Sequence, residues 1–107
     1  MRLDRVFGAL ADPTRRAILE RLTGGDAMVT ELAAPFNSSL PAISKHLHVL
    51  EEAGLIVRRA IGRKRICSIV PSAMLSAEEW LDTYRRFWTE RLDALEETLK
   101  SDEENEI

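Results

Sequence analysis

Basic residues with no acid among them cluster at positions 58–65 of this 107-residue chain. The cluster consists of Arg58, Arg59, Arg63, Lys64 and Arg65. Guanidinium and ammonium groups bind phosphate oxygens, although a short basic run can also be a solvated surface. The formal net charge of −3 conceals the cluster, because positions 1–70 carry +4 and positions 71–107 carry −7. Such an asymmetry points to nucleic acid as a partner.

A second set of polar residues lies on one side of a helix predicted over 39–53. Ile43, Leu47 and Leu50 recur at i, i+4 and i+7 and form the buried face of that helix. At about 100° per residue, the side chains that point away from this face in the first two turns are Pro41, Ser44, Lys45 and His48. These short or polar side chains can approach base edges and phosphates closely. Ser38 and Ser39 precede the helix, where free N–H groups and the helix dipole suit a phosphate.

The two histidines and the single cysteine leave alternatives open. His46 lies at the margin of the buried face, so we expect a scaffold histidine bonded to the neighbouring helix rather than a DNA contact. His48 faces outward and is either a DNA contact or a solvated side chain. Cys67 is expected to be a small buried residue of a strand, with a redox switch or an intersubunit disulfide as the alternatives.

The elements that position these residues follow from hydrophobic periodicity and from residues that start and stop helices. Helices are predicted over 3–10, from Asp12-Pro13 to Gly24-Gly25, over 31–36, over 39–53 and over 77–100. Thr30 and Ser39 are the expected N-caps of the third and fourth helices, and Ser76 with Glu79 forms an expected capping box. After Gly54, two β-branched segments over 55–61 and 65–70 flank the turn 62–64 and predict a β-hairpin with a basic tip.

This order of elements predicts a mainly α fold with a β-hairpin: a single winged helix-turn-helix domain over 1–107 with a helical extension. In a helix-turn-helix, the second helix enters the major groove of double-stranded DNA with its N-terminal residues nearest the base edges. The hairpin tip is the wing, and its Arg63, Lys64 and Arg65 reach backbone phosphates or a minor groove.

Other function classes find little support in the sequence. The longest apolar runs are only a few residues, whereas a membrane-spanning helix needs about 20. Arg2, Asp4 and Arg5 interrupt the N-terminus where a signal peptide would need an apolar stretch, so we expect a cytoplasmic protein. Cys67 and the histidines have no acid or amide at a catalytic spacing, so we expect no enzyme.

The last predicted helix carries an apolar stripe that is wider than one small domain needs to cover. Part of the stripe is expected to pack on the first helix, and the rest would be an exposed patch that a soluble monomer rarely tolerates. Pairing two such helices across a two-fold axis would bury it. We therefore expect a homodimer with an interface formed by Leu3, Val6, Phe7, Trp80, Leu81, Tyr84, Phe87, Trp88, Leu92 and Leu95, and with Leu99 extending the stripe.

Three segments, 9–16, 38–56 and 62–65, together resemble the arsenical-repressor (ArsR) family, and the similarity extends over nearly the whole chain. The resemblance implies a homodimeric winged-helix repressor that binds an operator. It assigns the recognition helix to 39–53, the wing to 55–70 and dimer contacts to the helices at 3–10 and 77–100. It names no effector.

Many members of this family hold a metal, either through cysteines in the short helix before the recognition helix or through Asp, His and Glu on the last helix. Here the segment 30–36 has neither Cys nor His, and the segment 77–100 has no His. We therefore expect no metal and no cofactor, in a branch of the family not built around metal sensing. Two alternatives for function stay open: a winged-helix protein-interaction module, whose exposed face should be apolar, and a redox-responsive repressor that uses Cys67.

Overall fold

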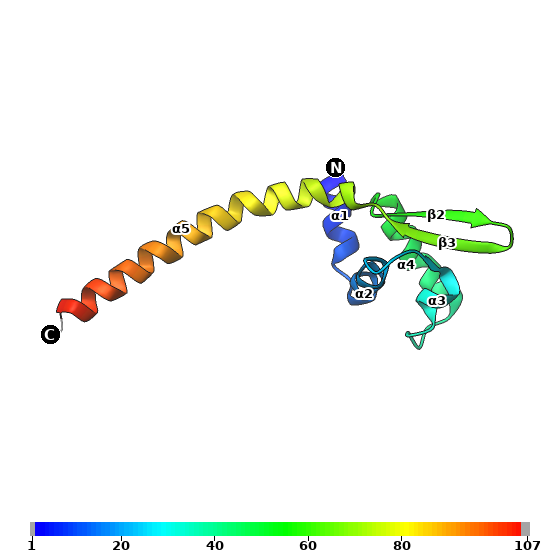
Figure 1. The fold of residues 1–107 in the computed structure, drawn as a ribbon, viewed down its shortest axis with the longest axis horizontal. Coiled ribbons are helices and arrows are strands. Elements are labelled where there is room, and N and C mark those ends of the chain that lie inside the picture. The colour runs from blue at the N-terminus through cyan, green and yellow to red at the C-terminus, as the bar shows by residue number, and fades with distance from the viewer. Residues whose placement is uncertain (1, 106–107) are drawn as a thin grey trace. The chain divides into compact units, whose positions relative to one another are not determined.

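The computed structural model describes residues 2–105, whose helices and strands are drawn in Figure 1. These residues divide into two units. The first unit ends at Ala77 and the second begins at Glu78. In chain order, the elements are α1 (Arg2–Leu10), α2 (Pro13–Leu22), β1 (Ala27–Met28), α3 (Val29–Ala33), α4 (Leu40–Glu52), β2 (Ile56–Ile61), β3 (Lys64–Ile69), the 3-10 turn η1 (Pro71–Met74) and α5 (Leu75–Asn105). The predicted winged helix-turn-helix fold is confirmed in the first unit.

The core of the first unit is built around the predicted apolar face of α4. Ile43, Leu47 and Leu50 are all fully buried. They pack in one cluster with apolar residues of α1, α2, α3, the sheet and the turn before β2, and large fully buried members of the cluster are Ile18, Leu22, Leu32, Leu55 and Ile56. Burying each such side chain contributes about 1.5–3 kcal/mol, so this face anchors α4 and leaves the opposite face to solvent.

The hairpin forms the larger part of a three-stranded antiparallel sheet with the order β1-β3-β2. Ile61 pairs with Lys64, so Gly62 and Arg63 alone make the turn. Gly62 has φ +62°, and no residue other than glycine has a positive φ among those described. This combination is typical of a type II′ hairpin turn, which places Gly at its first position. β1 was not predicted, because a strand of two residues has no periodicity to detect.

Two of the predicted caps are wrong. Thr30 is the second residue of α3, which begins at Val29 because the carboxylate of Glu31 accepts the backbone N–H of Met28 and caps the helix from there. Ser76 lies inside α5, because η1 leads directly into a helix that starts at Leu75. At its other end α5 passes the predicted stop and reaches Asn105, since no Gly or Pro interrupts the segment 101–105.

Candidate nucleic-acid interface

The start of α4 is capped as the sequence predicted, and this cap changes what the helix can offer to a phosphate. The Oγ of Ser39 accepts the N–H of Ala42 at 3.3 Å, and the carbonyl of Ser39 accepts the N–H of Ile43 at 3.1 Å. Pro41 has no N–H to offer. In the described part of the chain, the N–H of Leu40 is therefore the only one of residues 40–43 without a partner. The cap thus occupies the N–H of Ala42, and the phosphate site predicted at the free N–H groups near Ser38 and Ser39 stays a prediction.

The outer face of α4 lies off the core as predicted. Pro41, Ser44, Lys45 and His48 are all exposed. Together with Val49 and with Arg58 of β2, they line a shallow hollow of about 630 Å³. Ser38 and Ser39 are also exposed, just before the helix. His48 lies 3.8 Å from Glu52, one turn later on the same surface.

The structure brings the wing tip and the start of α4 together. Arg63, Lys64 and Arg65 line one hollow of about 460 Å³ with Pro41 and Ser44. The other lining residues, which sequence reasoning missed, are Met28, Val29, Thr30 and Leu40. Leu40 is 52% exposed although it lies close to the apolar stripe of α4, because it occupies the first turn at the edge of the core.

Ion pairs determine which cations of this surface remain free to contact a phosphate. Arg58 makes two hydrogen bonds to the carboxylate of Glu51, at 3.1 and 3.2 Å. They lower the pKa of the Glu51 carboxyl and raise the pKa of the Arg58 guanidinium. Arg59 pairs with Asp26 at 3.1 Å. Within residues 2–105, the cations of this surface that have no carboxylate within 4.0 Å are Lys45, Arg63, Lys64 and Arg65.

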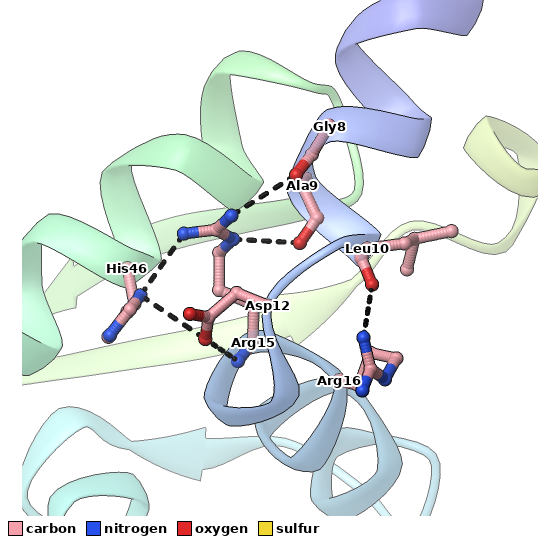
Figure 2. Close-up of polar contacts among 7 residues, drawn as sticks. All are labelled: Gly8, Ala9, Leu10, Asp12, Arg15, Arg16 and His46. Carbon is pink, nitrogen blue, oxygen red and sulfur yellow. Dashed lines mark hydrogen bonds and ion pairs between the residues drawn. The ribbon is translucent and has the colours of Figure 1, made fainter.

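His46 is a scaffold residue, as expected, and not part of the outer face. Its Nδ1 lies 3.3 Å from Nη1 of Arg15 and 3.8 Å from Oδ2 of Asp12, both at the start of α2 (Figure 2). Asp12 also caps α2 by accepting the N–H of Arg15 at 3.1 Å. This backbone hydrogen bond is the largest cause that lowers the pKa of the Asp12 carboxyl, and the charge of Arg15 lowers it further.

Cys67 is fully buried in β3, which confirms the expected small buried residue. Burial raises the pKa of its thiol, so the reactive thiolate is disfavoured. In the described part of the chain, no group of three or more His, Cys, Asp or Glu side chains is placed to hold a metal ion. Nor does that part contain a helix long and apolar enough to span a bilayer.

The predicted dimer residues fall into two groups. In α1, Val6 is fully buried in the core, so its side chain has no surface to offer a partner, whereas Leu3 and Phe7 are half-buried against the core. In α5 the predicted residues are all exposed, from 45% for Trp80 to 59% for Trp88 and Leu92. Their rings contact one another along the helix: Trp80 lies 4.5 Å from Tyr84 and Phe87 lies 5.9 Å from Trp88, between centroids.

Comparison with known proteins defines the family. A helix-turn-helix domain model matches residues 10–59. The HTH-type transcriptional regulator Rv2034 of Mycobacterium tuberculosis is 41% identical over 99 residues, which is 92% of this chain and 90% of that protein. The crystal structure of an ArsR family transcriptional regulator superposes with a TM-score of 0.78 at 45% identity, covering 83% of this chain and 98% of that one. This chain belongs to the ArsR family.

As an ArsR-family member, the chain is a DNA-binding transcriptional regulator with a winged helix-turn-helix and not an enzyme. The transcriptional repressor SdpR of Bacillus subtilis is also similar, at 37% identity over 79 residues, which is 74% of this chain and 88% of that protein. A homodimeric winged helix-turn-helix DNA-binding domain of Mb0332 from Mycobacterium bovis superposes with a TM-score of 0.64 at 27% identity, covering 80% of this chain and 82% of that one.

Proposed function

We propose that this regulator is a homodimeric repressor that binds its operator through the outer face of α4 and the wing. The observation that carries the proposal is the shared hollow in which the exposed start of α4 meets three cations, Arg63, Lys64 and Arg65, that have no carboxylate partner within residues 2–105. The centre of a protein–protein interface would instead be depleted of charged residues. The name of the similar protein SdpR supports repression.

The geometry supports different contacts with DNA for α4 and for the wing. Ser44 and Lys45 stand on the exposed side of the first two turns of α4, where they can donate to base edges in the major groove. Leu40 and Pro41 add apolar surface suited to thymine methyl groups. The cations of the wing contact phosphates or a narrow minor groove. The ion pair between Arg58 and Glu51 joins β2 to α4 and so fixes the wing relative to the recognition helix.

The dimer is supported by α5, which cannot bury its own stripe. Three pairs of apolar residues repeat 11 positions apart, Leu81 with Leu92, Tyr84 with Leu95 and Trp88 with Leu99. A repeat of 11 is close to three helical turns, so these six residues form one continuous stripe along α5. All six are about half-exposed. A second copy of the same stripe would cover it in a self-complementary contact, and Leu3 and Phe7 of α1 would extend the interface.

An electrophoretic-mobility assay with the upstream region of the protein's own gene tests DNA binding. Lys45→Ala should weaken binding to the operator by about 1–3 kcal/mol if Lys45 contacts a base edge. If Lys45 contacts only phosphate, the loss should be similar on unrelated DNA. Wild-type affinity on both kinds of DNA would remove Lys45 from the interface. Failure of the wild-type protein to bind any duplex would favour the protein-interaction alternative.

Sedimentation tests the dimer with a matched pair of variants. Replacing Phe87 and Trp88 by serine should produce monomers that no longer bind the operator. Replacing the next two residues, Thr89 and Glu90, by serine makes the same number of changes outside the predicted interface and should leave the dimer intact. A wild-type protein that is monomeric at micromolar concentration, yet binds its operator tightly, would refute the dimer.

A further inference from the structure

The side chain of Arg15 joins three helices of the first unit. Arg15 lies near the start of α2, and its guanidinium points toward the end of α1 on one side and toward α4 on the other (Figure 2). Its Nε donates to the carbonyl of Ala9 at 2.7 Å, and its Nη2 donates to the carbonyl of Gly8 at 3.1 Å. Its Nη1 lies 3.3 Å from the Nδ1 of His46. One planar group thus connects the last turn of α1 with the second turn of α4.

The end of α1 needs such a donor because of the residue that follows it. In a continued helix, the carbonyl of Ala9 would accept the N–H of residue 13, but Pro13 has none. Arg15 supplies the missing donor to Ala9. The neighbouring Arg16 does the same for the carbonyl of Leu10, at 2.8 Å. The two arginines differ in one respect: the hydrogen bonds of Arg16 end at α1, whereas Arg15 continues to α4.

The contact with His46 also defines the hydrogen-bonding state of that ring. A guanidinium can only donate, so in the hydrogen bond between Arg15 and His46 the Nδ1 of His46 is the acceptor. The side chain of His46 is 27% exposed and belongs to α4, between the buried Ile43 and Leu47 on one side and the outer face on the other. A hydrogen bond to this ring therefore restrains the rotation of α4 about its own axis.

We infer that Arg15 and His46 are positioning residues that fix the recognition helix relative to α1. The inference rests on the proposed function, in which α1 contributes Leu3 and Phe7 to the dimer and α4 contributes Ser44 and Lys45 to DNA. In such a dimer, the orientation of α4 relative to α1 sets how the two recognition helices are presented to successive major grooves. The Arg15–His46 contact matters for binding two half-sites at once and not for binding one.

Variants of His46 separate this role from mere packing. His46→Asn keeps an acceptor close to the place of Nδ1 and should bind the two-half-site operator like the wild type. His46→Leu keeps the volume without an acceptor and should bind it about tenfold more weakly, the usual effect of one charge-assisted hydrogen bond. Arg15→Lys should lose as much, because one ammonium cannot replace a guanidinium that reaches three acceptors. Combining Arg15→Lys with His46→Leu should add little further loss.

Arg16→Ala is the matched control, because it uncaps the same end of α1 without touching α4. It should lower the melting temperature yet leave operator affinity unchanged. Each variant is titrated with the two-half-site operator and with a single half-site, and its dimerisation is followed by sedimentation. The inference predicts a loss on the two-half-site operator alone, with the dimer intact.

Two results would overturn the inference while the wild type still binds as a dimer. One is equal operator affinity for wild type and His46→Leu. The other is a parallel loss on both kinds of site by His46→Leu, His46→Asn and Arg16→Ala, which would show a general loss of folded protein. If the wild type does not distinguish two half-sites from one, the proposed dimeric function itself is wrong.

Discussion

Replacing Arg63, Lys64 and Arg65 together by alanine is expected to flatten the salt dependence of operator binding without unfolding the domain. All three side chains are exposed, and exposed substitutions of this kind usually change the free energy of unfolding by less than about 0.5 kcal/mol. None of the three has a carboxylate within 4.0 Å among the described residues, so each is free to neutralise a phosphate.

The size of the effect follows from the number of cations removed. Each phosphate contact contributes about 0.9 to the slope of the logarithm of the association constant against the logarithm of salt concentration. A dimer loses six cations with the triple replacement, so the slope should fall by up to about 5. Lys45→Ala removes two more, and it should lower the slope by about 2 only if Lys45 contacts phosphate.

Fluorescence anisotropy with a labelled operator, titrated over a series of salt concentrations, measures these slopes. The control combines Asp26→Asn with Arg59→Gln, which removes a neighbouring cation of β2 together with its partner at 3.1 Å. Because that pair is already neutral, the slope should not change. A triple variant with the wild-type slope, or a control that flattens the slope as strongly, would refute the assignment of free cations to the wing.

Three further predictions concern stability and the expected absence of redox and metal regulation. Arg58 lowers the pKa of Glu51 below its ordinary value of 4.5 in the folded state, so the stabilisation by Glu51 is present above that value and is lost as pH falls through the lowered pKa. Glu51→Gln should therefore lower the free energy of unfolding by about 1 kcal/mol or less at neutral pH, since the pair is partly exposed. In urea unfolding, the free energies of unfolding of wild type and variant should become equal in acid. Cys67→Ser should lower the free energy of unfolding by about 1–3 kcal/mol, because a hydroxyl replaces a fully buried thiol. An oxidant should leave the operator affinity of the wild type unchanged. An affinity that falls on oxidation in the wild type but not in the variant would support the redox-responsive alternative. A chelator should change neither the melting temperature nor operator affinity, and stoichiometric metal whose removal abolishes binding would contradict this.

Local signals allowed the elements that carry the candidate site to be predicted from the sequence. Asp12 with Pro13 and Ser39 with Pro41 combine a side-chain cap with a residue tolerated in the first turn, and α2 and α4 begin there. The spacing of Ile43, Leu47 and Leu50 then determined which side of α4 is exposed. Gly62 allowed the hairpin turn to be located.

What the sequence could not provide depends on contacts between distant positions. Asp26 and Arg59 are 33 positions apart, so no local pattern shows that this cation is neutralised. The contact between Arg15 and His46 spans 31 positions. Val6 and Phe7 are neighbours in an amphipathic helix, yet only Val6 is fully buried, because the surrounding elements determine how far the core extends around α1.

The distribution of charge implies that salt acts in opposite directions on the two proposed contacts. The segment 78–107 has a formal net charge of −7. Within α5, Arg86 forms an ion pair with Asp82 and Lys100 forms one with Glu96, while the guanidinium carbon of Arg91 lies 4.8 Å from the ring centroid of Phe87. Two such helices repel each other, and screening relieves that repulsion, so salt should strengthen the dimer while it weakens DNA binding. The slope of operator affinity against salt concentration therefore has to be measured at protein concentrations where all of the protein is dimeric at every salt concentration. At lower protein concentrations, salt would strengthen dimerisation and offset part of the phosphate attraction that it screens. The measured slope would then understate the number of wing cations that bind DNA.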